Sequence, residues 1–194
     1  MRIEHISLIG WLHSVACVAA LFLGAWNLLM PKGTATHRLV GRWYVGTMLV
    51  VNLSVFGIFH FDVILSRPPV VGPNVFGIFH WGAVATLLLL GLGVYAARRQ
   101  RRAVWAYVHP VSMILTYYML IGGLINEAFV RVTVLRDFAM AHAPQAVNVA
   151  RTPIVGMVQG LAMLLFIVLI FYFMVKVALY RRSQRRTASF ASAA

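Results

Sequence analysis

The stretch IVGMVQGLAMLLFIVLIFYFMVKVALY, residues 154–180, decides the fold, because Lys176 is its only charged residue. A helix of about 20 apolar residues crosses the ~30 Å hydrocarbon core of a bilayer. Four more apolar stretches precede it, at residues 7–29, 42–64, 75–97 and 105–125. Because backbone groups in lipid must hydrogen-bond within their own segment, these stretches should be helices and not strands. The sequence therefore predicts an all-α integral membrane protein with five transmembrane helices.

The composition of the whole chain leaves few residues outside the membrane-spanning stretches. Hydrophobic residues make up 61% of the 194 residues, charged residues only 11%, and the mean hydropathy is +0.84. No separate soluble catalytic domain is therefore expected. Short connections after the first three helices favour an up-and-down bundle. We expect one domain over residues 1–182, followed by a flexible basic tail over residues 183–194.

The net charge of +13 is distributed as a topology signal. If the N-terminus is outside, twelve of the seventeen basic residues fall in inner segments around residues 32–42, 98–102 and 176–186, and all four acidic residues fall outside. An excess of Lys and Arg on the inner side is the rule that orients membrane proteins. The sequence thus predicts an outer N-terminus and an inner C-terminus, with the lipid bilayer as the surroundings and no nucleic-acid partner.

Few kinds of chemistry fit this composition. The single cysteine, Cys17, excludes a disulfide within the chain and a metal site built from cysteines. No nucleophile–base constellation, phosphate-binding loop or pair of carboxylates occurs, which argues against a hydrolase or a transferase. An enzymatic role, if the chain has one, would be that of a membrane oxidoreductase or an electron-transfer subunit.

Five histidines near the helix ends form the most informative pattern. His13, His60 and His80 fall toward the outer face of the bilayer, and His37 and His109 toward the inner face. At about 1.5 Å of rise per residue, the two layers lie ~15 Å apart. An ionisable side chain in hydrocarbon is costly, so its usual explanation is functional. Two layers of imidazole predict two metal centres and electron transfer across the membrane.

The cofactor that suits such layers is haem b, with one haem in each. Haem iron takes an axial imidazole through a neutral ring nitrogen, while the other ring nitrogen usually donates to an acceptor. We expect His13 to pair with His80 in the outer layer, and His37 to pair with His109 in the inner layer. His60 is the extra histidine of the outer layer. It would replace His13 as a ligand or donate a hydrogen bond beside the site.

The start of the second helix adds two arginines to this hypothesis. Arg38 and Arg42 are placed to bind the propionates of the inner haem, although they equally serve the positive-inside rule. Thr34 or Thr36 would cap this helix earlier than residue 42 and place His37 on its first turn.

Two other interpretations remain open. His13, His60 and His80 would form a single outer site for copper, zinc or iron, since imidazole binds all three metals. Alternatively, the chain would hold no cofactor and act as an accessory or assembly subunit of a membrane complex. The outer segment of residues 126–152, which mixes apolar and charged residues, would then dock the other subunits. A hydrogen bond to a neighbouring helix would also be enough to explain any single buried histidine.

The stretch from Lys32 to Tyr44, KGTATHRLVGRWY, resembles the signature of an uncharacterised family of bacterial predicted membrane proteins. In that family a Lys-Gly-Thr, then a His-Arg, then a Gly open the second helix. The similarity extends over the first four helices and includes His13, His80, Trp81, His109, Met113, Glu127 and Arg131. It implies a multi-pass protein of the bacterial cytoplasmic (inner) membrane.

More loosely, the layout resembles diheme membrane cytochromes b and ferric-reductase-like proteins, in which histidines on alternating helices hold one haem near each face. This resemblance implies electron transfer from quinol or a redox-protein partner, by the chain alone or as a subunit of a larger redox complex. The chain departs from the pattern through the extra His60, and its fifth helix supplies no ligand.

Overall fold

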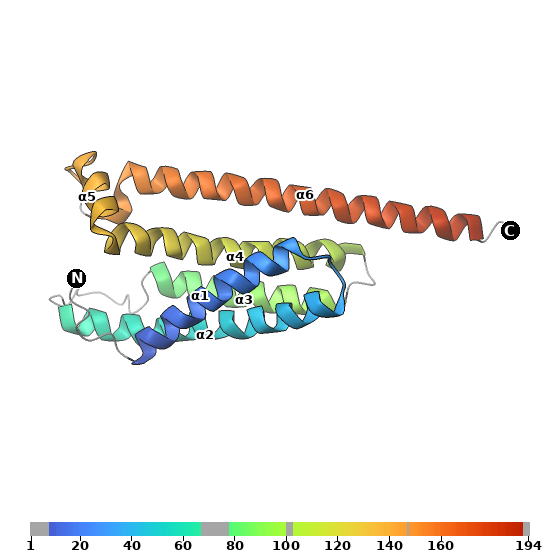
Figure 1. Ribbon diagram of the computed structural model, residues 1–194, viewed down its shortest axis with the longest axis horizontal. Helices are drawn as coiled ribbons and strands as arrows, with labels where there is room; N and C mark the ends of the chain where they lie inside the picture. Colours follow the sequence, from blue (N-terminus) through green and yellow to red (C-terminus); the bar gives the residue numbers. More distant parts are fainter. Residues whose placement is uncertain (1–7, 67–77, 100–102, 147, 192–194) are drawn as a thin grey trace. The chain divides into compact units, whose positions relative to one another are not determined.

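The computed structural model describes residues 8–66, 78–99, 103–146 and 148–191, which form helices and short connections with no strand among them (Figure 1). Five of these helices are long and apolar enough to cross a membrane. The predicted all-α membrane fold with five transmembrane helices is thereby confirmed. In chain order the elements are α1 (Leu8–Leu29), α2 (Ala35–Ser66), α3 (Ile78–Arg98), α4 (Ala103–Arg131), α5 (Thr133–Ala141), the 3₁₀ helix η1 (Val149–Arg151) and α6 (Pro153–Ala191).

The chain divides into two compact units, Met1–Leu88 and Leu89–Ala194, and each is described by itself. The first unit holds the hairpin of α1 and α2 and the beginning of α3. The second holds the remainder of α3, followed by α4, α5 and α6. The single domain over residues 1–182 stays a prediction.

A tight connection joins α1 to α2. Gly33 adopts a φ of +81°, a left-handed conformation that side chains rarely tolerate. Thr34 then caps α2, because its Oγ1 accepts the backbone N–H of His37 at 3.1 Å. The helix consequently begins at Ala35 and not at residue 42, as the alternative of a cap at Thr34 predicted.

Small residues bring α1 close to α2. Ala16, Ala20 and Gly24 follow one another at single-turn spacing along α1, and all three are buried. On α2, Tyr44 and Met48 are almost completely buried. Lipid provides no hydrophobic drive between helices, so such close van der Waals contact is what holds membrane helices together. This packing fixes the register of one helix against the other.

The second unit is built on α4 and α6, with α5 and η1 covering one end of the pair (Figure 1). Beside this end, Gln159 Nε2 of α6 donates to Asn126 Oδ1 of α4 at 2.9 Å. The segment 126–152, which we predict to lie outside, consists largely of the end of α4, α5 and η1. A small apolar core holds these elements together, formed by Phe129, Ala139, Val149 and Val155.

Two helices run further than expected. The expected end of α4 at residue 125 is wrong, because the helix continues to Arg131 and includes the i,i+4 ion pair between Glu127 and Arg131. Helix α6 continues to Ala191, so the backbone of residues 183–191, expected to be a flexible tail, is helical. Arg, Gln and Ala have good helix propensity, and no Gly or Pro stops the helix there.

Candidate functional site

His13 is a half-buried residue of α1 whose two ring nitrogens both face polar atoms. Its Nδ1 lies 2.8 Å from Ser54 Oγ and 3.1 Å from the backbone oxygen of Val51, both on α2. Ser54 donates its own hydroxyl hydrogen to the same Val51 oxygen at 2.9 Å. Because a carbonyl can only accept, Nδ1 carries the ring proton and Nε2 carries the lone pair. Cys17, one turn along α1, donates its thiol to Nε2 at 3.4 Å.

This arrangement sets the tautomer that a metal-binding histidine needs. A ligating imidazole coordinates through one neutral nitrogen and donates from the other to a carbonyl, a carboxylate or water. In His13 the donating nitrogen is Nδ1, so Nε2 is the nitrogen available for coordination. The thiol of Cys17 occupies that lone pair, and coordination therefore requires the thiol to rotate away. A thiol is a weak donor, so this rotation sacrifices only a weak hydrogen bond.

His80, the second ligand predicted for the outer layer, lies near the start of α3 and is only 7% exposed. Its ring centroid lies 5.4 Å from that of Phe56, with the ring planes at 52°. Ala83 and Thr86, one and two turns further along α3, are buried as well. Helix α3 therefore buries the face that carries His80. The pairing of His80 with His13 stays a prediction.

His60, the extra histidine of the outer layer, belongs to the last turns of α2, and its side chain lies outside the described residues. Of the alternative outer metal site formed by His13, His60 and His80, the structure therefore describes the side chains of His13 and His80. Among the side chains that the structure describes, no group of three or more His, Cys, Asp or Glu residues is placed to hold a metal ion. His13 and Cys17 together supply two donors.

At the other end of the α1–α2 hairpin, the Lys-Gly-Thr stretch is a helix connector whose side chains bind the backbone. Arg38 Nη1 donates to the carbonyl of Gly33 at 2.9 Å. Lys32 Nζ donates at 2.7, 2.8 and 3.1 Å to the carbonyls of Asn27, Leu28 and Met30. The end of a helix carries partial negative charge, so an ammonium group there is stabilising. Lys32, Gly33, Thr34 and Arg38 therefore all serve the turn itself.

The residues predicted for the inner haem begin directly after this turn. His37 is half-buried on the first turn of α2, while Arg38 and Arg42 are exposed. Arg38 uses one guanidinium nitrogen for Gly33 and keeps its other N–H groups for a second acceptor. The role of the two arginines as propionate ligands stays a prediction.

His109 lies in the second unit, half-buried on α4. Its Nδ1 lies 2.9 Å from the carbonyl oxygen of Gly93 on α3. As at His13, this partner fixes the ring proton on Nδ1 and the lone pair on Nε2. A larger residue at position 93 would displace Met113, because a Cβ there would lie 2.7 Å from Met113 Sδ. His37 and His109 belong to different units, so their pairing stays a prediction.

His142 provides an internal comparison. It is exposed at the end of α5, and its Nδ1 donates to the carbonyl of Phe138 in its own helix at 2.8 Å. Its ring also packs on the Phe138 ring, with the centroids 4.5 Å apart. His142 therefore finds its hydrogen-bond acceptor within its own helix, whereas His13 and His109 reach acceptors on a neighbouring helix.

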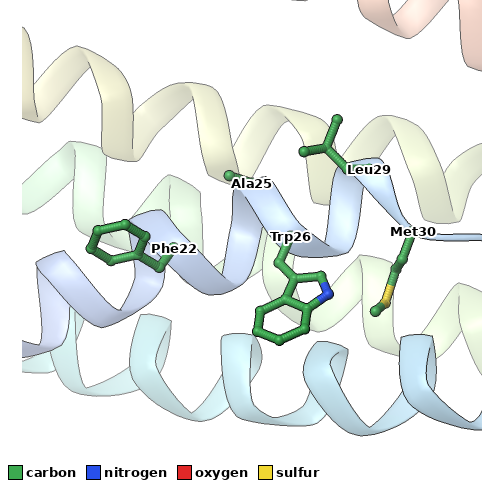
Figure 2. A pocket seen from close by; sticks show the side chains of 5 residues that line it. All are labelled: Phe22, Ala25, Trp26, Leu29 and Met30. Atoms are coloured by element: carbon green, nitrogen blue, oxygen red, sulfur yellow. The ribbon is translucent and has the colours of Figure 1, made fainter.

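A shallow hollow on α1 contains no histidine. Figure 2 shows its lining, which comes from α1 and from Met30 directly after it. Three of the five lining side chains, Phe22, Trp26 and Leu29, are exposed, as expected of a surface that faces lipid. The complete lining is Phe22, Ala25, Trp26, Leu29 and Met30. No side chain in it is a good ligand for haem iron apart from the thioether of Met30.

Comparisons with models of protein families, with curated proteins and with solved structures find no match to the chain. The resemblances to a bacterial membrane family and to diheme cytochromes therefore stay predictions. The function has to be argued from the site itself.

Sequence analysis missed the partners that lie far along the chain. Val51 and Ser54 are 38 and 41 residues away from His13, and Gly93 is 16 residues away from His109. His13 and Cys17, by contrast, are predicted to share a helix face, because residues four apart lie on one side of a helix.

Proposed function

We propose that the protein is a b-type diheme cytochrome that transfers electrons across the bacterial cytoplasmic membrane. His13 and His80 ligate one haem in this proposal, and His37 and His109 ligate the other. One observation carries it: His13 and His109 each donate Nδ1–H to a backbone carbonyl of a neighbouring helix and so present Nε2. This is the tautomer and the outer hydrogen bond that ligating histidines use.

The contrast with His142 strengthens this support. A histidine that only needs a hydrogen-bond partner finds one in its own helix, as His142 does with Phe138. At His13 and His109 the acceptor belongs to another helix, so ring orientation depends on tertiary packing. Both helices are apolar spans in which an ionisable side chain is costly. Retaining an oriented imidazole there is easiest to explain by a ligand on the second nitrogen.

The donor set fits haem at His109 directly, and at His13 once the Cys17 thiol turns aside. Haem supplies one-electron oxidation and reduction at its iron when it is bound. The chain holds the His13 and His109 rings through Nδ1, and a carbonyl that accepts a hydrogen bond from Nδ1–H makes the imidazole more basic. Arg42 and the remaining N–H groups of Arg38 balance the charge of the propionates.

The direction and the partners belong to the same proposal. The distribution of basic residues places the N-terminus outside and the C-terminus inside. Quinol or a redox protein delivers or receives the electrons at the two faces.

A cofactor-free accessory subunit is the second candidate, and an exposed apolar pair on α5 favours it. Val134 and Phe138 are 76% and 54% exposed and stand four residues apart, on one face of α5. Such a face suits docking to another subunit through the segment 126–152. A single non-haem metal ion at the outer histidines is the remaining alternative.

The test is a reduced-minus-oxidised visible spectrum of detergent-purified protein, with the haem content measured as pyridine haemochrome. We expect a b-type band at about two haems per chain. His13→Ala and His109→Ala should each remove about half of the haem. His142→Ala is the matched control, because it also removes an imidazole that donates to a carbonyl, and it should keep both haems. A colourless protein after expression with ample haem contradicts the proposal, and metal analysis of that protein then separates the two alternatives.

A further inference from the structure

A small cleft in the second unit is lined by two arginines. It lies between the first turn of α4 and the far part of α6 and has a volume of about 170 Å³. Tyr107 adds a phenol hydroxyl, and the small residues leave room beside the charged ones. The complete lining is Ala103, Tyr107, Ala178, Arg181 and Arg182.

Among the residues that the structure describes, no carboxylate pairs with the positive charge of this cleft. Within the described residues neither Arg181 nor Arg182 forms an ion pair. The two acids of this unit, Glu127 and Asp137, are already paired with Arg131 and Arg136. Glu127 also lies 24 residues along α4 from Ala103, which is about 36 Å away at the rise of a helix. The start of α4 adds partial positive charge of its own.

The length of the apolar stretch of α6 leads us to expect the cleft at the level of the lipid phosphates. Arg181 and Arg182 directly follow the apolar stretch of α6 that ends at Tyr180. A span of that length reaches the edge of the hydrocarbon core, where the headgroups begin. A guanidinium group binds two phosphate oxygens at once, and a phenol hydroxyl donates to a third.

We propose that this cleft is a binding site for the phosphate of an anionic phospholipid, with phosphatidylglycerol as the simplest representative. Arg181 and Arg182 bind the phosphate oxygens, and Tyr107 donates a further hydrogen bond. The acyl chains run along the exposed apolar faces of α4 and α6. The site does not depend on the proposed haem centres, since it contains none of their residues.

The experiment titrates the full-length protein in detergent with phosphatidylglycerol and counts bound lipid by native mass spectrometry. We expect one saturable site. Arg181→Gln with Arg182→Gln should weaken it about thirtyfold, because each basic residue at a membrane surface contributes a factor of about five. Tyr107→Phe should weaken it about fivefold, the effect of one hydrogen bond.

The matched control is Arg98→Gln with Arg99→Gln. These two residues are also consecutive arginines at a helix end, and they do not line the cleft. The control should bind lipid with nearly unchanged affinity. Equal weakening by both double variants would show a diffuse attraction between basic surface and acidic lipid, and would overturn the site. Inorganic phosphate is titrated in parallel. If it binds as tightly as the lipid and displaces it, the ligand is a free anion and the lipid assignment is wrong.

Discussion

Adding a methyl group at Gly93 should destabilise the second unit by forcing α3 away from α4. A Cβ at this position would lie 2.7 Å from Met113 Sδ and 3.3 Å from both Met113 Cγ and Ser112 Cβ. Ordinary contact begins at 3.4 Å, so the sulfur would have to retreat by about 0.7 Å (3.4 − 2.7). The end of a methionine side chain can move, but the Ser112 Cβ is fixed to the backbone of α4. The helices must therefore separate by a few tenths of an ångström.

The magnitude follows from two opposing effects. Overpacking of this kind costs ~1–3 kcal/mol, and replacing glycine by alanine inside a helix returns up to ~1 kcal/mol. We expect Gly93→Ala to lower the free energy of unfolding by up to ~2 kcal/mol. Gly91→Ala is the matched control, because among the described residues no heavy atom beyond its own helix backbone and chain neighbours lies within 4 Å of its Cβ position. It should be as stable as the parent protein or slightly more stable.

The assay is reversible unfolding in detergent, followed by circular dichroism, for both alanine variants and for each combined with Met113→Ala. Truncating Met113 removes the atom that the new methyl group meets, so the gap between the two glycine variants should shrink in that background. Such a double-mutant cycle isolates the contact from the helix propensity. If Gly93→Ala is as stable as Gly91→Ala, the inferred approach of α3 to α4 at this glycine is wrong.

Three further substitutions test other contacts by the same unfolding assay. Ser54→Ala should lower the free energy of unfolding by ~0.5–1.5 kcal/mol, because it removes one of the two acceptors of His13 Nδ1–H. A decrease well above this range would show that Nδ1–H does not keep its hydrogen bond to Val51 O. Lys32→Met should cost ~0.3–1 kcal/mol at low salt and less at high salt, because salt screens an exposed ammonium at a helix end. An unchanged stability at low salt would contradict its capping role. Asn126→Leu should cost ~0.6–1.7 kcal/mol by leaving Gln159 unpaired, and adding Gln159→Leu should restore most of it. No recovery in that double variant would refute the pairing.

The fold was predictable because membrane spans are encoded locally. Length and hydropathy of each segment are sufficient to identify a helix that crosses lipid, without any knowledge of its neighbours. The start of α2 was also predictable from nearby residues, because it depends on one contact, between Thr34 Oγ1 and the backbone N–H of His37. The end of α4 was missed because Glu127 and Arg131 were treated as an outer polar segment, although their i,i+4 spacing supports helix.

The candidate site was predictable only in part, because its decisive contacts join distant residues. The sequence placed His13 and Cys17 on one helix face, and the structure places the thiol against the ring. It could not indicate Val51, because that contact depends on the register of α2 against α1, which buried small residues set. Arg38 was assigned to a propionate by its charge, whereas its contact to Gly33 O exists because the backbone turns sharply at a positive φ.

The geometry of the α1–α2 connector provides a structural explanation for part of the Lys-Gly-Thr signature. Lys32, Thr34 and Arg38 each bind backbone atoms of the turn, and Gly33 supplies its left-handed residue, so a helix hairpin alone explains these four positions. His37 differs, because its contact to Thr34 uses the backbone N–H, which any residue other than proline would supply. The cap of α2 therefore does not depend on the imidazole of His37. Replacing His37 by Leu should leave this cap intact while removing the inner haem if the cytochrome proposal is correct.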